Sequence, residues 1–126
     1  MSISIDHVGV PAVDPEASAQ LLGEILGEGA TSPQGPDCEM FNLSVGRSAL
    51  TYFQMSAPFP HHIALRVTEP VFVGAIQRLR SLGMPFGNDP GDPTNGNTFD
   101  PLGGLGRIYF CDHNDHLFEL FVATKD

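Results

Sequence analysis

The sequence repeats one pattern of elements in its two halves. In the first half, apolar and polar residues alternate over residues 3–10, which predicts a strand. Asp14-Pro15-Glu16 then combines a capping side chain, a proline and an acid, the pattern of a helix start, and Gly27 predicts where that helix ends. Residues 61–67 and Thr68-Glu69-Pro70 repeat the strand and the helix start in the second half.

Three short strand-like runs follow the helix in each half. They cover residues 30–32, 39–45 and 48–55 in the first half, and 84–87, 107–112 and 117–123 in the second. A loop rich in Asp, Pro, Asn and Gly precedes the last two runs, and loops of that length are usually functional or mobile. We therefore predict an α+β fold of two paired βαβββ modules, at about residues 1–57 and 58–126, within a single domain.

Composition narrows the range of partners. The chain has 126 residues, 41% of them hydrophobic, which is enough to bury a core and excludes wholesale disorder. Its net charge of −9 argues against binding to nucleic acid or to an anionic membrane surface. No apolar run approaches the roughly 20 residues of a membrane span, and we see no signal peptide. The two cysteines, Cys38 and Cys111, are interpreted as reduced thiols in a cytoplasmic protein.

Two histidines and one glutamate stand at matching places in the repeat. His7 and His62 lie 55 residues apart, each in the first strand of its half, and Glu119 lies in the last strand. A single strand histidine is more often a core or surface residue, but the paired positions favour a facial metal triad. Tyr52-Phe53-Gln54 matches Leu117-Phe118-Glu119, so Gln54 is the candidate for a fourth ligand.

Three segments resemble one known family. They are the opening Ile-Asp-His-Val-Gly-Val, the later His-Ile-Ala-Leu-Arg-Val, and the closing Gly-Arg-Ile-Tyr-Phe-Cys-Asp-His-Asn-Asp-His-Leu-Phe-Glu-Leu. With the repeat, they resemble the vicinal oxygen chelate superfamily, the fold of glyoxalases, bleomycin-resistance proteins and extradiol dioxygenases. The resemblance implies sheets curled around a metal-binding cavity, a homodimer, and a divalent metal held by His7, His62 and Glu119. It also implies that His7 often comes from a different subunit than His62 and Glu119.

Tyr109 favours oxygen chemistry within that superfamily. Extradiol dioxygenases carry a tyrosine ten residues before the metal-binding glutamate, and Tyr109 stands at that distance from Glu119. Their acid/base histidine is absent, and Asp100 lies in the stretch where it would stand. Phe86-Gly87-Asn88-Asp89-Pro90 is similar to a subgroup that includes an oxygenase of the chartreusin pathway. We predict oxidation of a small aromatic or polyketide-like vicinal diol, with Tyr109 catalytic and Fe2+ or Mn2+ favoured.

Other residues and other functions remain candidates. Arg107 alternates with Tyr109 on one strand and is predicted, with Asp100 and Phe53, to contact the substrate. A glyoxalase-type isomerase or lyase with Zn2+ or Ni2+ is one alternative, although the Gln54 amide cannot take a proton near neutral pH. The other alternative is a metal-free protein that sequesters a small molecule, as bleomycin-resistance proteins do.

Overall fold

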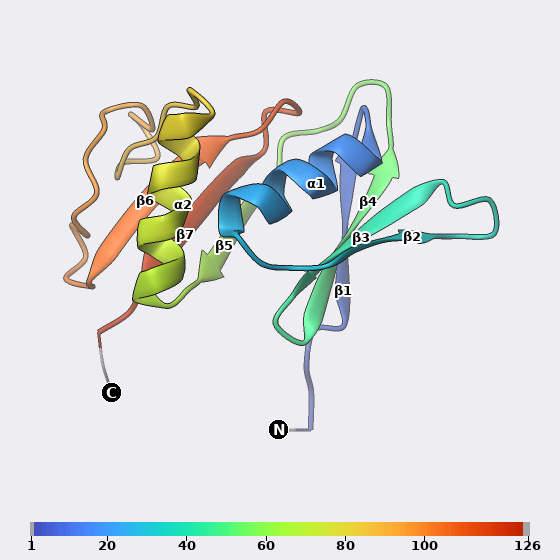
Figure 1. Ribbon diagram of the computed structural model, residues 1–126, viewed down its shortest axis with the longest axis horizontal. Coiled ribbons are helices and arrows are strands. Elements are labelled where there is room, and N and C mark those ends of the chain that lie inside the picture. The colour runs from blue at the N-terminus through green and yellow to red at the C-terminus, as the bar shows by residue number, and fades with distance from the viewer. Residues whose placement is uncertain (1, 125–126) are drawn as a thin grey trace. The chain divides into compact units, whose positions relative to one another are not determined.

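A computed structural model describes residues 2–124 of the chain. It divides into two compact units, of which the first ends at Phe59 and the second begins at Pro60. Each unit holds one sheet and one helix (Figure 1). Neither helix, in the part of the chain that the structure describes, has the length and apolar character needed to cross a membrane.

The first unit is a four-stranded sheet with one helix. Its elements are β1 (His7–Ala12), α1 (Pro15–Leu26), β2 (Thr31–Gln34), β3 (Met40–Val45) and β4 (Ser48–Gln54), with strand order β1-β4-β3-β2. β1 runs parallel to β4, and the other pairs are antiparallel. The helix begins as predicted, since the Asp14 carboxylate accepts the Ala17 N–H at 3.1 Å. It ends at Gly27, whose φ of 72° is left-handed.

Alternation along the strands separates the two faces of this sheet. Val10, Leu50 and Tyr52 point to one face and are buried, together with the apolar side of α1. His7 pairs with Ala49, so it lies on the opposite face. In the first unit α1 therefore covers one face of the sheet, and the opposite face, which carries His7, is not covered by the helix.

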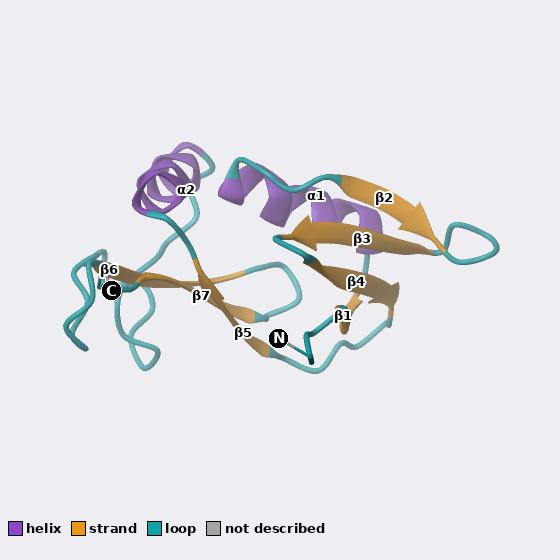
Figure 2. Ribbon diagram, turned by 90° about the horizontal axis from the view of Figure 1, so that it is seen from below, coloured by secondary structure: helices purple, strands orange, loops and turns teal. Residues whose placement is uncertain are grey.

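The second unit repeats this plan with three strands. Its elements are β5 (His62–Arg66), α2 (Glu69–Ser81), β6 (Gly106–Cys111) and β7 (Leu117–Val122), with strand order β5-β7-β6. Figure 2 shows α2 lying over one face of this sheet. Ile108, Phe110, Phe118 and Leu120 are buried on a single face by their register. Glu119 has the opposite parity and lies on the other face.

Two predicted strands are shorter than expected. The first begins at His7 rather than residue 3, and Ile3 and Ile5 remain exposed. The run over residues 84–87 is reduced to one bridge between Gly87 and Tyr109. Pro85 has no N–H to donate to a neighbouring strand, which helps to explain why the pairing does not extend.

Gly106 permits the close packing of α2 on the second sheet. A Cβ atom placed there would lie 2.5 Å from Cε2 of Phe72, a buried side chain of α2. We expect Gly106→Ala to lower the free energy of unfolding by roughly 1–3 kcal/mol, because the ring and the helix must shift. Urea unfolding measures this. Gly96→Ala serves as a comparison without a clash. A Cβ at Gly96 would meet nothing within 4 Å, so this variant measures only the strain of a positive φ.

Candidate functional site

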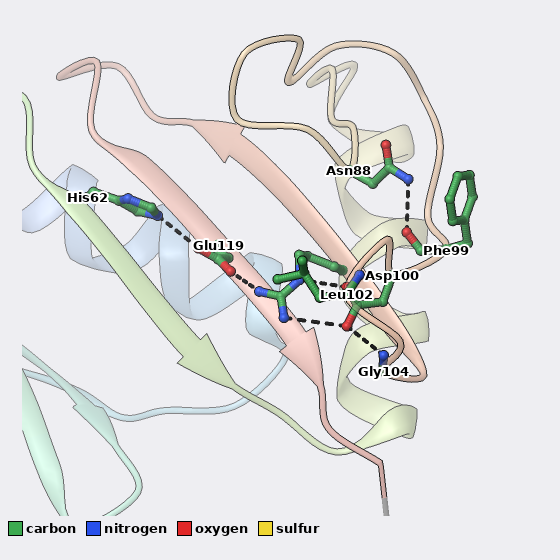
Figure 3. A network of polar contacts seen from close by, with 8 residues as sticks. His62, Asn88, Phe99, Asp100, Leu102, Gly104 and Glu119 are labelled. Atoms are coloured by element: carbon green, nitrogen blue, oxygen red, sulfur yellow. Dashed lines mark hydrogen bonds and ion pairs between the residues drawn. The ribbon is translucent and has the colours of Figure 1, made fainter.

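His62 and Glu119 meet on the face of the second sheet that α2 does not cover. β5 is parallel to β7, with His62 opposite Leu117 and Ala64 opposite Glu119, so both side chains point to one face. His62 Nε2 lies 2.9 Å from Glu119 Oε1 (Figure 3). The His62 side chain is 52% exposed and that of Glu119 only 10%, so the pair is open to solvent from the histidine side.

The second oxygen of Glu119 is held by an arginine. Arg107 lies on β6, and its Nη1 donates to Glu119 Oε2. Arg107 also lies over the Phe121 ring, with its guanidinium carbon 4.7 Å from the ring centroid. A carboxylate that is expensive to bury is thus stabilised by a cation from the neighbouring strand.

Asp100 anchors this arginine from the preceding loop. Arg107 Nε donates to Asp100 Oδ1 at 2.9 Å, and the backbone N–H groups of Leu102 and Gly104 donate to the same carboxylate at 2.8 and 3.0 Å (Figure 3). The Arg107 hydrogen bond lowers the pKa of Asp100, and the same contact raises the pKa of Arg107. Both groups are therefore charged at neutral pH.

The predicted role of Asp100 in contacting substrate does not match this placement. Its side chain is 1% exposed, and its carboxylate is occupied by Arg107 and by two backbone N–H groups. A carboxylate with a lowered pKa also has no proton to give near neutral pH, so it is a poor replacement for the missing acid/base histidine. Arg107 is likewise committed to two carboxylates.

Tyr109 lies directly opposite Glu119 on β6. Arg107 and Tyr109 share the Glu119 face, as their alternation predicts, and the Tyr109 ring centroid is 6.1 Å from that of His62. Burial, followed by the negative charge of Glu119, raises the pKa of Tyr109. Its hydroxyl therefore keeps its proton at neutral pH and can act as a hydrogen-bond donor on this face.

His7 belongs to the first unit. It lies on the face of its sheet that α1 does not cover, and its Nδ1 is 2.8 Å from Asp6 Oδ2. A carboxylate on one ring nitrogen is the usual arrangement that orients a histidine for binding metal through the other. The His7–Asp6 contact is exposed to solvent.

The donor atoms of the second unit fit a divalent metal in part. Ligand bonds of about 2.1 Å at near-right angles place two ligand atoms about 3 Å apart, and the His62–Glu119 spacing of 2.9 Å matches this. Imidazole and carboxylate are also the donors that Fe2+, Mn2+ and Zn2+ accept. Over residues 2–124, however, no three or more His, Cys, Asp or Glu side chains gather into a group that could hold an ion. Each unit by itself supplies an incomplete set.

The predicted match of Gln54 with Glu119 is wrong. Ala64 lies two residues after His62 on β5, and its partner on β7 is Glu119. Gly9 lies two residues after His7 on β1, and its partner on β4 is Thr51, whereas Gln54 pairs with Ala12. Gln54 is three residues too far along, and an odd shift turns a side chain to the other face of a sheet. The structure does not bring Gln54 to the His7 face.

Register also identifies a residue that sequence reasoning missed. Asn42 on β3 lies opposite Thr51, just as Tyr109 lies opposite Glu119 in the second unit. Phe53, which the sequence predicted as a substrate contact, lies on the same face as His7, and its ring packs against Gly9. Once the parallel pairing is known, these positions follow from alternation alone, and a polar Asn between Phe41 and Leu43 is the only sequence signal.

The known proteins that match this chain are solved structures. No family model and no curated protein matches the chain. Oxidase ChaP-H2 is 30% identical, with a TM-score of 0.85 over 100% of this chain and 96% of its own. Oxidase ChaP-H1 is 29% identical, with a TM-score of 0.85 over 99% of this chain and 98% of its own.

More distant structures share the fold. The fosfomycin resistance protein FosX of Listeria monocytogenes, in complex with Mn(II) and sulfate, is 18% identical, with a TM-score of 0.69 over 98% of this chain and 93% of its own. These proteins are all members of one superfamily. On its identity to ChaP-H2 over nearly the whole of both chains, this chain belongs to the vicinal oxygen chelate superfamily.

Proposed function

We propose that the chain is a divalent-metal-dependent enzyme of the dioxygenase type, which oxidises a small aromatic or polyketide-like vicinal diol. The observation that carries this proposal is the His62–Glu119 pair, 2.9 Å apart on one sheet face, with Tyr109 directly opposite Glu119 on the same face. The similarity to two proteins named as oxidases supports the choice of reaction. Fe2+ or Mn2+ is the metal that we favour.

His62, Glu119 and His7 would hold the metal. A divalent metal held there would supply Lewis acidity, which lowers the pKa of substrate hydroxyls, and iron would also supply redox chemistry. Arg107 keeps Glu119 oriented, with Oε2 engaged and Oε1 directed to His62. Tyr109 keeps its proton and donates a hydrogen bond to a substrate oxygen.

We further propose a homodimer in which one subunit contributes His7 and the other contributes His62 and Glu119. The support is that the second unit gathers two of the three ligands and the first unit presents the third on a separate sheet. A shared site of this kind makes metal binding depend on dimer formation.

Metal content tests the proposal directly. After anaerobic purification, we expect about one Fe2+ or Mn2+ per chain in the wild type and a loss of most of it in His62→Ala. His113→Ala, which removes an exposed histidine of the same unit, is the matched control and should retain the metal. Oxygen uptake with catechol-type diols then tests the reaction. Zinc or nickel without oxygen uptake would instead favour the isomerase or lyase chemistry of glyoxalases.

Mixing two inactive variants tests the shared site. His7→Ala and Glu119→Ala homodimers each lack a ligand in both sites, whereas a mixed dimer holds one intact site if the ligands come from two chains. Unfolding and refolding an equimolar mixture should therefore restore about a quarter of the wild-type metal, since half the dimers are mixed and each has one good site of two. No recovery in a mixture that is dimeric would contradict the proposal.

A metal-free binding protein is the second candidate, and one contact favours it. Arg107 compensates the charge of Glu119 without any metal, so the pair is stable as a structural ion pair. If so, purified protein contains no stoichiometric metal, added Fe2+ or Mn2+ does not raise its melting temperature, and small-molecule binding is unaffected by a chelator.

A further inference from the structure

The sheet face that carries His62 and Glu119 continues along β5 to an arginine. Ala64 and Arg66 follow His62 at steps of two residues, so the three side chains point to one face, and all three residues are exposed. Arg66 pairs with Phe121 on β7, one step beyond the pairing of Ala64 with Glu119. At about 3.3 Å per residue, this step is about 7 Å along the strand. A cation therefore lies close beyond the His62–Glu119 pair on the same face.

Ala64 leaves the space between His62 and Arg66 open. Its side chain is a single methyl group, and it stands between the two longer side chains on the exposed face of β5. A flat molecule can therefore lie along β5 over Ala64, with one end at His62 and the other at Arg66. Phe121, which pairs with Arg66, is only partly buried and adds apolar surface at that end.

The two arginines beside Phe121 differ in their charge balance. Arg107 pairs with Phe121 from β6, and its charge is compensated by Asp100 and Glu119. Within residues 2–124, Arg66 forms no ion pair and no side-chain hydrogen bond. The chain has 15 acidic residues against six Lys and Arg, so carboxylates are plentiful, yet none is placed beside Arg66. Its guanidinium group is thus available to an anion from outside the chain.

We propose that Arg66 determines specificity, by binding a carboxylate group of the aromatic substrate. The planar guanidinium group can donate two parallel hydrogen bonds to a carboxylate, which fixes the orientation of the bound molecule. Because Arg66 lies two steps along β5 from His62, this carboxylate is at the end of the ring system away from the diol. The substrate class is then an aromatic diol that carries a carboxylate. The inference rests on the proposed function for the diol, but the position and free charge of Arg66 do not depend on a metal.

A pair of probes tests the anion site without metal. We would titrate the full-length protein in EDTA at pH 7 with 2-naphthoate and with 2-naphthamide, and follow the fluorescence of the probes. The two molecules have nearly the same shape, but only 2-naphthoate carries a negative charge. We expect the wild type to bind 2-naphthoate at least about tenfold more tightly, because its carboxylate forms charge-assisted hydrogen bonds.

Two substitutions of Arg66 separate its charge from its geometry. Arg66→Met should bring the ratio of the two dissociation constants close to one. Arg66→Lys keeps the charge but loses the planar pair of donors, so it should retain a smaller preference for 2-naphthoate. The melting temperature of Arg66→Met should equal that of the wild type, since this exposed arginine has no ion pair to lose.

Two other arginines provide matched controls. Arg80 is exposed on α2, which covers the opposite face of the sheet, and Arg47 borders a cavity in the first unit. Arg80→Met and Arg47→Met should both keep the wild-type ratio. The proposal is wrong if Arg66→Met keeps the preference, if Arg47→Met removes it, or if the wild type binds both probes equally or neither. Because no metal is present, these outcomes are separate from failure of the metal-content test.

Discussion

Arg107→Met is expected to destabilise the chain by about 3–5 kcal/mol, because it leaves two buried carboxylates without their cation. The Arg107 side chain is 12% exposed and forms ion pairs with Asp100 and Glu119, which are 1% and 10% exposed. Methionine has a similar length and fills the same space, so the loss is electrostatic rather than a cavity effect. Urea unfolding at pH 7 measures it, and the loss is a large part of the total stability of a typical domain.

Two further variants separate charge from packing. In Arg107→Met combined with Asp100→Asn, one unpaired carboxylate is removed, so part of the lost stability should return. Arg47→Met replaces an exposed arginine in the first unit and should change the free energy of unfolding by less than about 0.5 kcal/mol. A loss below about 1 kcal/mol in Arg107→Met itself would show that water already compensates these carboxylates.

Local signals in the sequence were sufficient to predict most of the fold. Asp14, Pro15 and Gly27 mark the ends of α1 through contacts made within one or two turns, and the structure confirms them. The repeat of a strand and a helix start correctly predicted two sheets, each with its own helix. The pattern failed where pairing depends on distant partners, as at residues 84–87, which form a single bridge with Tyr109.

The site was predicted in part, for the same physical reason. His62 and Glu119 were predicted as ligands of one metal, which requires a common face, and β-strand alternation places both there together with Tyr109. Gln54 was matched to Glu119 because the residues before each are similar. The sheet face on which Gln54 lies is set by the register between β4 and β1, which no local sequence pattern encodes. The Asp100–Arg107–Glu119 network depends on a loop folding back to a strand, and only the structure reveals it.

Glu119→Gln is expected to abolish metal binding while leaving the fold nearly intact, which separates the two roles that this residue can have. Its amide oxygen can still accept from Arg107, and Arg107 remains paired with Asp100. We therefore expect the free energy of unfolding to change by no more than about 1.5 kcal/mol. An amide carries no charge and is a weaker ligand for a divalent metal than a carboxylate, so affinity should fall about 100-fold or more.

Titration of metal-free protein with Mn2+ against a fluorescent chelator measures that affinity. Glu69→Gln, which neutralises an exposed glutamate at the start of α2, is the matched control and should bind Mn2+ as the wild type does. If Glu119→Gln also kept wild-type affinity, the His62–Glu119–Arg107 contacts would be a structural ion-pair network. If affinity is lost while the unfolding curve stays in place, the buried arginine serves to position a metal ligand in advance, because it holds Glu119 directed toward His62 before any metal binds.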